Sequence, residues 1–339
     1  MTIRRVLLVG ALLVVVLLAA LAIGVSQGIR QIEQTPLSET DRPPLTVPSG
    51  SSFATVTAML ADRGLIDHPL PLRLYARWQG IAARIQAGEY AIPAGLSAAG
   101  LMRRMVDGDV IQYRLTIIEG WRIDELLAAV RSHPAIDRTL PADVAHSAVM
   151  EAIDRPDEAA EGRFLPETYR FPRGTTDVAL LRRANRDLES TLESVWAQRA
   201  DDLPLADADE ALTLASIIEK ETGQADERRR IAGVFIRRLK RGMRLQTDPT
   251  VIYGLGEGFD GDLRRRHLRA DTPYNTYTRH GLPPTPIALA GRAAIEAAVD
   301  PAAGDSLYFV SRGDGSHVFS ATLEAHNRAV RRYQRGEGE

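Results

Sequence analysis

An unbroken apolar run near the N-terminus constrains this chain more than any other feature. Residues 6–25 read VLLVGALLVVVLLAALAIGV and include no charged side chain. A helix of about 20 residues, rising about 1.5 Å per residue, is long enough to cross a hydrocarbon core of about 30 Å. The run therefore predicts a transmembrane helix, and the remaining residues must fold outside the bilayer.

The charges around this run predict its orientation. Arg4 and Arg5 precede it, and the next basic residue is Arg30. The positive-inside rule then places the first residues in the cytoplasm and the rest of the chain outside. The alternative is a cleaved signal peptide, whose apolar region is usually about 7–15 residues long and ends at a small-x-small site. The longer run, and the lack of a clear A-x-A pattern in the residues SQGIRQIEQTP that follow it, favour an anchor, and both interpretations export the rest of the chain.

Composition excludes several classes of function. The 339 residues suffice for an anchor and two modest domains, and a formal net charge of -2 gives no reason to expect nucleic-acid binding. The absence of cysteine excludes disulfides, thiolate metal sites and cysteine nucleophiles. The seven histidines form no H-E-x-x-H pattern, and the chain has no P-loop or G-x-G-x-x-G motif. We therefore expect neither a metal nor a cofactor.

The pattern of apolar residues and turns predicts an α+β chain in several parts. Residues 1–5 form a cytoplasmic tip, 6–25 the transmembrane helix, and 26–44 a proline-containing linker. Residues 45–108 form a small α/β module whose helices are capped by Ser51 or Ser52 and by Ser97, and end at Gly108. Residues 109–335 form a larger, mainly helical domain with some strands, including a hairpin around the turn RGDG.

One helix of the larger domain places a carboxyl group at the end of an apolar stripe. The segment LTLASIIEKETG covers residues 212–223. Side chains three and four residues apart share a helix face, so Leu214 and Ile217 lie on the same side as Glu221. Glu219 lies about 200° around the helix. The two glutamates therefore cannot point into the same site, and only Glu221 extends the apolar stripe.

A carboxyl group at the edge of an apolar face loses hydration, which raises its pKa. A general acid for glycosidic cleavage needs a raised pKa, because it must still hold a proton near neutral pH. The plainer interpretation is that Glu221 ends the helix at the surface and pairs with an arginine among residues 228–230. The helix alone does not decide between these interpretations, and Glu219 stays an alternative acid.

Several long motifs connect the chain to a known family. They are ASIIEKETG at 215–223, VFIRRLKRGMRLQTDPTVIYGLG at 234–256, TPYNTYTRHGLPPTPI at 272–287 and YFVSRGDGSHVFSATLEAHNRAV at 308–330, with TIIEGWRIDEL and EGRFLPETYRF upstream. Together they strongly resemble the MltG (YceG-like) family of endolytic murein transglycosylases. The resemblance covers nearly the whole chain, and it implies that the small module is a LysM-like glycan-binding domain.

The resemblance also implies the reaction and its catalytic residue. The family's catalytic glutamate is the second of E-K-E-T, which corresponds to Glu221. A lytic transglycosylase is a carbon–oxygen lyase that breaks the bond between N-acetylmuramic acid and N-acetylglucosamine without water. The muramoyl 6-hydroxyl attacks its own anomeric carbon and leaves a 1,6-anhydro ring. One carboxyl group can serve as acid and then as base, whereas a hydrolase normally uses two.

Further candidates lie in the segment LQTDPT. Gln246, Thr247 and Asp248 match the family pattern there and can hydrogen-bond sugar hydroxyl and acetamido groups. An alternative for Asp248 is structural, because aspartate followed by Pro249 is typical of a capping residue and the first residue of a short helix.

A polar loop and two other glutamates complete the candidates. Asn275 and Tyr277 lie in a proline-rich loop, where tyrosine can stack on a sugar ring. The alternative is that Asn275 caps backbone groups. Glu219 has a supporting role, pairing with an arginine or capping backbone. Glu167 stands where the family usually has aspartate, which leaves its role open.

We therefore expect an enzyme of the bacterial inner membrane whose catalytic domain is periplasmic. Its substrate is the nascent glycan strand of peptidoglycan, and the family implies glycan-polymerising synthases as partners. Cutting these strands would terminate their elongation. Two alternatives stay open, a muramidase-type hydrolase and a non-catalytic peptidoglycan-binding scaffold.

Overall fold

The computed structural model describes residues 2–334, with side chains from Leu7 onward. The predicted cytoplasmic side chains of Arg4 and Arg5 lie outside the described residues, as does Arg335 at the end of the predicted catalytic domain. The chain divides into two compact units, one of residues 1–113 with 171–174 and one of residues 114–170 with 175–339. Each unit is described separately below.

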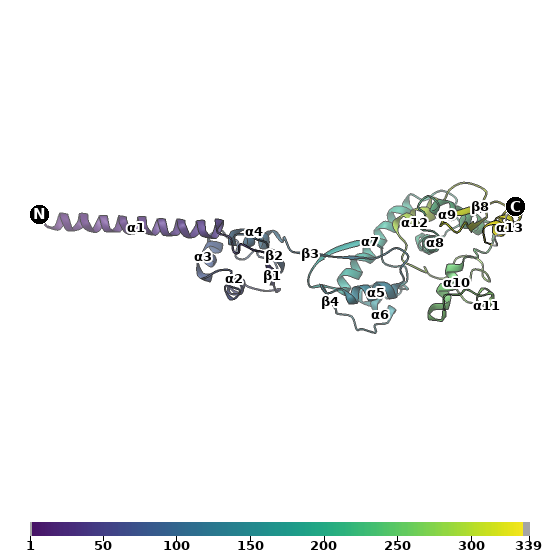
Figure 1. The fold of residues 1–339 in the computed structure, drawn as a ribbon, viewed down its shortest axis with the longest axis horizontal. Helices are drawn as coiled ribbons and strands as arrows, with labels where there is room; N and C mark the ends of the chain where they lie inside the picture. The colour runs from purple at the N-terminus through teal and green to yellow at the C-terminus, as the bar shows by residue number, and fades with distance from the viewer. Residues whose placement is uncertain (1, 335–339) are drawn as a thin grey trace. The chain divides into compact units, whose positions relative to one another are not determined.

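Helix α1 covers Thr2–Gln34 and contains the apolar run (Figure 1). Its large apolar side chains are exposed, as at Leu12 and Leu17, which expose 64% and 66% of their surface. The part Leu7–Gln34 is long and apolar enough to cross a membrane. The predicted apolar helix is confirmed, and among the described residues its most apolar stretch is not buried by other parts of the chain.

The predicted linker differs from what the structure contains. Helix α1 continues through its first part to Gln34, and strand β1 begins at Arg42. Ile32 and Leu37 pack against the core of the small module. The segment QGIRQIEQ has no glycine or proline after Gly28, so nothing in it ends the helix before Thr35 and Pro36. Most of the linker is therefore part of a folded unit.

The small module has two antiparallel strands and three helices. Its elements are β1 (Arg42–Val47), α2 (Phe53–Asp62), α3 (Pro69–Trp78), β2 (Gly88–Ile92) and α4 (Ala98–Asp107). The backbone N–H of Thr55 bonds Ser52, and that of Gly100 bonds Ser97, so both serines cap their helices. Gly108 ends α4 with a φ of 70°. These predicted elements are confirmed.

The second unit is mainly helical. Its helices are α5 (Ile123–Ser132), α6 (His146–Ala152), α7 (Asp177–Ala197), α8 (Ala208–Glu221), α9 (Arg228–Lys240), α10 (Asp248–Leu255), η1 (Gly256–Gly258), α11 (Arg265–Arg269), α12 (Arg292–Val299) and α13 (Leu323–Gln334). Within it, strand β4 (Ile136–Asp137) pairs with β6 (Thr175–Thr176), and β7 (Tyr308–Ser311) pairs with β8 (His317–Ser320). Strands β3 (Gln112–Thr116) and β5 (Thr168–Pro172) form a further two-stranded sheet, and only residues 114–116 and 168–170 of these strands belong to this unit. The mixed helix and strand class is as predicted.

Helix α8 lies at the centre of this unit. Every side chain of residues 211–218 is buried, and α7, α9, α10 and α12 all pack against the helix. The sequence predicts an apolar stripe along one face of this helix, but residues 211–218 are buried on every face. The cause is the small side chains Ala211, Ala215 and Ser216, which allow neighbouring elements to approach from the remaining sides. Only the last turn, with both glutamates, reaches the edge of the core.

Candidate active site

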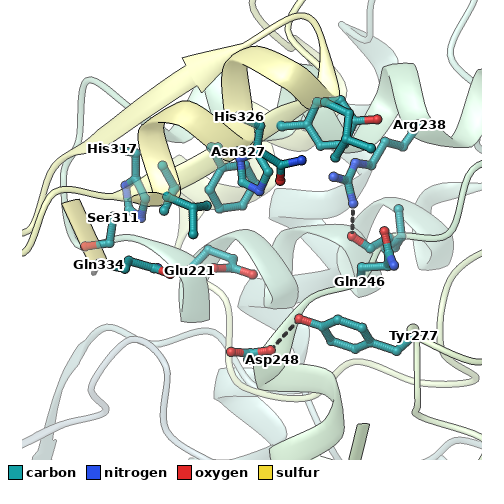
Figure 2. Close-up of a pocket in the computed structure, with 16 residues that line it drawn as sticks. Glu221, Arg238, Gln246, Asp248, Tyr277, Ser311, His317, His326, Asn327 and Gln334 are labelled. Carbon is teal, nitrogen blue, oxygen red and sulfur yellow. Dashed lines mark hydrogen bonds between the residues drawn. The ribbon is translucent and has the colours of Figure 1, made fainter. Parts of the chain in front are cut away.

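A polar pocket of about 470 Å³ lies at the C-terminal end of α8. Five segments surround it: the end of α8, helix α9, the segment at the start of α10, the loop that carries Tyr277, and the hairpin β7–β8 with α13. Its polar lining includes Glu221, Arg238, Gln246, Asp248, Tyr277, Ser311, His317 and His326. Figure 2 shows Glu221 pointing into this pocket, with Asp248 and Tyr277 on one side and His317 on the other.

Glu221 is the last residue of α8 and is half-buried. The helix ends because Thr222 is extended, with φ -148° and ψ 135°. The hydroxyl of Thr247 donates a hydrogen bond to Glu221 Oε1. Burial raises the pKa of Glu221 to about 7, and the negative charge of Asp248 adds to this rise. The Thr247 bond and the charges of His317 and Arg238 act against it. A large share of Glu221 therefore holds a proton near neutral pH.

Glu219 has different partners, as the helical geometry predicts. Its Oε2 accepts the backbone N–H of Gly291 at 2.9 Å, and its Oε1 lies 3.9 Å from Arg228. Burial raises the pKa of Glu219, and Glu119 contributes to that rise. It is therefore Glu219, and not Glu221, that lies beside the arginine run. Its side chain caps backbone away from the pocket.

The LQTDPT segment contributes three neighbouring residues with different roles. Gln246 lines the pocket and has a positive φ of 53°. Thr247 is buried, its N–H bonds the hydroxyl of Thr276 at 3.1 Å, and its own hydroxyl holds Glu221. Thr247, and not Asp248, is the residue before α10, so the predicted capping position of Asp248 was wrong by one residue. This leaves the Asp248 carboxylate free to accept the hydroxyl of Tyr277 at 2.6 Å.

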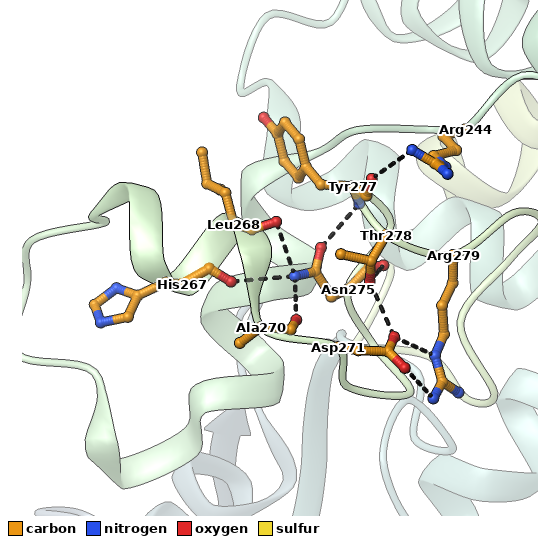
Figure 3. A network of polar contacts seen from close by, with 9 residues as sticks. All are labelled: Arg244, His267, Leu268, Ala270, Asp271, Asn275, Tyr277, Thr278 and Arg279. Carbon is orange, nitrogen blue, oxygen red and sulfur yellow. Dashed lines mark hydrogen bonds and ion pairs between the residues drawn. The ribbon is translucent and has the colours of Figure 1, made fainter.

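Tyr277 and Asn275 occupy different places in the polar loop. Tyr277 lines the pocket, and burial and then the Asp248 bond raise its pKa, so its hydroxyl stays a donor. Asn275 is 1% exposed and lies outside the pocket lining. Its amide nitrogen donates to Ala270 O at 2.6 Å and to His267 O at 3.1 Å, while its Oδ1 accepts the N–H of Tyr277 at 2.9 Å (Figure 3). Asn275 therefore sets the shape of the loop that presents Tyr277.

Sequence reasoning missed an arginine and a histidine of the pocket. Arg238 is 7% exposed and donates to Leu307 O at 2.7 Å and to Leu245 O at 2.6 Å, which joins α9 to two walls of the pocket. His317 Nδ1 lies 2.7 Å from Glu227 Oε2, and the N–H of His317 bonds the other oxygen at 2.9 Å. No spacing rule of a single helix or strand connects His317 with Glu221, because the hairpin that carries His317 begins at Tyr308, far along the chain from the end of α8.

Other groups do not add to this site. Glu167 is exposed, lies outside the pocket lining, and accepts the N–H of Thr168 at 2.7 Å. Within the part of the chain that the structure describes, no group of three or more histidine, aspartate or glutamate side chains is placed to hold a metal ion. Glu221 is the carboxyl group of the pocket whose pKa is raised, and Thr247 is its hydrogen-bonding partner.

Thr247 is expected to set the working pH through its bond to Glu221. Thr247→Val removes a bond that lowers the pKa of Glu221, so the fall of kcat/KM on the alkaline side, near pH 7 in the wild type, should move to higher pH. Thr247→Ser keeps the hydroxyl and should restore the wild-type profile. The measurement is kcat/KM on glycan strands between pH 5 and 9, together with thermal stability. An unmoved alkaline limb in a folded Thr247→Val enzyme would show that the bond has no part in proton transfer.

The chain combines an N-terminal helix apolar enough to cross a membrane with a polar pocket in which the pKa of Glu221 is raised, and the comparisons identify its family. The model of the YceG-like family matches residues 45–332. The chain therefore belongs to the YceG-like family.

Relatives of this chain occur in several bacteria. It is 30% identical over 313 residues to the endolytic murein transglycosylase of Bacillus subtilis, covering 85% of this chain and 84% of that protein. It is also 26% identical to the endolytic murein transglycosylase of Streptococcus pneumoniae. That match covers 84% of this chain and 57% of the S. pneumoniae protein. A crystal structure of a YceG-like protein from Listeria monocytogenes matches with a TM-score of 0.52 and 28% identity, over 86% of this chain and all of that one.

Proposed function

We propose that this protein is an endolytic peptidoglycan lytic transglycosylase with Glu221 as its catalytic acid and base. The observation that carries the proposal is the state of this one side chain: Glu221 opens into a polar pocket and its pKa is about 7. A group with that pKa can donate and then accept a proton at neutral pH with little energetic cost in either direction. The choice of substrate is supported by the B. subtilis endolytic murein transglycosylase, because the match covers 84% of that protein.

The reaction proceeds in two proton transfers through Glu221. The protonated carboxyl group first donates to the oxygen between N-acetylmuramic acid and N-acetylglucosamine, and that bond breaks. The substrate's own acetamido group can stabilise the positive charge at the anomeric carbon, as in substrate-assisted glycosidases. The Glu221 carboxylate then takes the proton of the muramoyl 6-hydroxyl, whose oxygen closes the 1,6-anhydro ring. The proton returned to Glu221 readies it for the next cut.

The residues around Glu221 have distinct roles in this proposal. Thr247 holds the carboxyl group in place through its hydroxyl. Gln246, Asp248 and Tyr277 face the pocket and bind sugar hydroxyl and acetamido groups. Asn275 positions Tyr277, and Glu219 supports the end of α8 through Gly291. Neither of these last two residues touches substrate.

A muramidase-type hydrolase is the second candidate, and Asp248 is the observation that favours it. Its carboxylate lines the same pocket as Glu221 and could activate a water molecule. However, the hydroxyl of Tyr277 donates a hydrogen bond to Oδ1 of this carboxylate at 2.6 Å. A carboxylate engaged in a charge-assisted bond is a weaker base, which favours intramolecular attack by the 6-hydroxyl.

The anchor and the small module define where this enzyme acts. Helix α1 crosses the inner membrane with its N-terminus in the cytoplasm, as Arg4 and Arg5 indicate. The catalytic unit is then periplasmic and reaches nascent strands close to the synthases that polymerise them, so each cut ends the elongation of a strand. The module of residues 45–108 is LysM-like and binds the same glycan. A non-catalytic scaffold would not need the pKa that Glu221 has.

The mode of cutting tests this proposal. We expect the full-length enzyme in detergent to shorten long, intact glycan strands from within. Average strand length should fall several-fold before disaccharide units appear in size-exclusion chromatography. Release of disaccharides while the remaining strands keep their length would indicate an exolytic enzyme, and binding without any cleavage would indicate a scaffold.

A further inference from the structure

Helix α3 of the small module is apolar on two opposite faces. Leu72 and Ala76 are 2% and 0% exposed and belong to the core of the module. On the other side, Leu70, Leu74 and Trp78 follow one another at a spacing of four residues and are 63%, 60% and 69% exposed. Side chains four apart form one stripe along a helix. A helix that is apolar on both sides needs an apolar partner on both sides.

This exposed stripe lies beside the outer end of α1. Both helices belong to the same compact unit, and the hydroxyl of Tyr75 on α3 donates to Glu33 on α1 at 2.9 Å. Leu70, Leu74 and Trp78 line a groove of about 600 Å³ whose other wall is α1 from Ala20 to Ile32. Figure 1 shows α3 next to the C-terminal part of α1. The stripe is therefore held at the level where the apolar run ends.

We propose that the α3 stripe, formed by Leu70, Leu74 and Trp78, inserts into the outer leaflet of the lipid bilayer beside α1. The inference rests on the membrane anchoring in the proposed function and adds a second contact to it. Its basis is continuity: Ala20, Leu21 and Val25 belong to the membrane-crossing run and also line the groove, so apolar surface passes from α1 to α3 without interruption. Lipid chains that surround the end of α1 must also meet the stripe.

The side chains at the edge of the stripe fit the boundary between lipid and water. Tryptophan is enriched at that boundary, because its ring is apolar and its N–H is polar. Arg77 precedes Trp78, is exposed, and lies one helical turn from Leu74. From there its guanidinium can reach lipid phosphates while its aliphatic part stays along the stripe.

This second contact would fix the orientation of the small module at the membrane. A single transmembrane helix leaves a domain free to tilt and rotate about the helix axis. Two contacts, one through α1 and one through α3, remove most of that freedom. The Tyr75–Glu33 bond then holds the angle between the two helices.

The chain offers a direct test, because it has three tryptophans and no cysteine. Trp121→Phe and Trp196→Phe leave Trp78 as the sole tryptophan of the full-length protein, and its emission is excited selectively over that of the tyrosines. We reconstitute it in nanodiscs of phosphatidylcholine and phosphatidylglycerol, with or without bromine on the acyl chains near the glycerol. We expect brominated lipid to lower Trp78 emission at least twofold. Leu70→Ser with Leu74→Ser should abolish most of this quenching while leaving glycan cleavage in detergent unchanged.

A lipid-depth control separates this inference from the anchor itself. Leu12→Cys, labelled with an environment-sensitive dye, reports whether α1 is in the bilayer. If the dye at Leu12 reports a lipid environment while Trp78 emission is unquenched and typical of water, the inference is overturned and the α1 anchor is retained. Unquenched but blue-shifted Trp78 emission also overturns it, because the stripe would then be covered by a second copy of the protein. A Leu12 label in water overturns both the anchor and the α3 contact.

Discussion

Glu221→Gln should lower kcat on glycan strands by about a thousandfold, because general acid–base catalysis contributes about 10²–10⁴ and the mechanism we propose assigns both proton transfers to this side chain. Glutamine keeps the size of the side chain and can still accept the Thr247 hydroxyl bond. It has no proton to give to the leaving oxygen and takes none from the 6-hydroxyl. The measurement is the initial rate of strand cleavage at pH 6.5, with binding of strands measured separately.

Stability and a neighbouring variant control for this result. In the folded protein Glu221 has a pKa of about 7, above the ordinary value of a glutamate, so the folded state binds the proton more tightly than the unfolded chain. The contribution of this group to wild-type stability should therefore fall as pH rises from the ordinary glutamate pKa to about 7 and stay low above it, and Glu221→Gln should be at least as stable at pH 8. Glu219→Gln changes the same helix and keeps the acceptor for Gly291. It should retain activity within a few-fold, and equal losses in both variants would contradict the assignment.

The second large effect is expected at Arg238, which joins two walls of the pocket. Arg238→Met fills similar space but leaves the carbonyl oxygens of Leu307 and Leu245 without their donor. An unsatisfied buried polar group costs about 1–3 kcal/mol, so we expect the free energy of unfolding to fall by about 3 kcal/mol. Cleavage should also fall by at least tenfold, because the hairpin and the loop before α10 lose their common support.

An exposed arginine near the end of the same helix is the matched control. Arg241 is solvent-exposed, so Arg241→Met should change the free energy of unfolding by less than about 0.5 kcal/mol. Urea denaturation followed by circular dichroism measures both variants. An Arg238→Met protein with wild-type stability and activity would show that the pocket walls hold together without this side chain.

Local features of this chain could be predicted from its sequence because their causes are local. The capping serines and Gly108 mark helix ends of the small module through bonds that span only a few residues. The hairpin around RGDG follows from two alternating strands and a glycine turn. The separation of Glu219 from Glu221 follows from the helix repeat alone.

The surroundings of Glu221 could not be predicted in the same way, because they depend on tertiary contacts. The hairpin strand with His317, buried Arg238 and the Thr247 loop meet only once α9, α10 and α13 have packed. Asn275 was expected to contact substrate, but its amide serves the backbone of its own loop. The residues after Gly28 allow α1 to continue to Gln34, but the packing of Ile32 against the small module, which accompanies this continuation, could not be predicted from linker composition.

The most direct test of the central claim is the chemical structure of the new strand ends. Intact strands are digested with the wild-type enzyme in ¹⁸O-labelled water, and the products are analysed by mass spectrometry. A lytic transglycosylase that uses Glu221 as acid and base produces 1,6-anhydro-muramoyl ends without ¹⁸O, and Glu221→Gln produces none. Reducing muramoyl ends that carry one ¹⁸O would contradict the account and identify a hydrolase, with Asp248 as the candidate base.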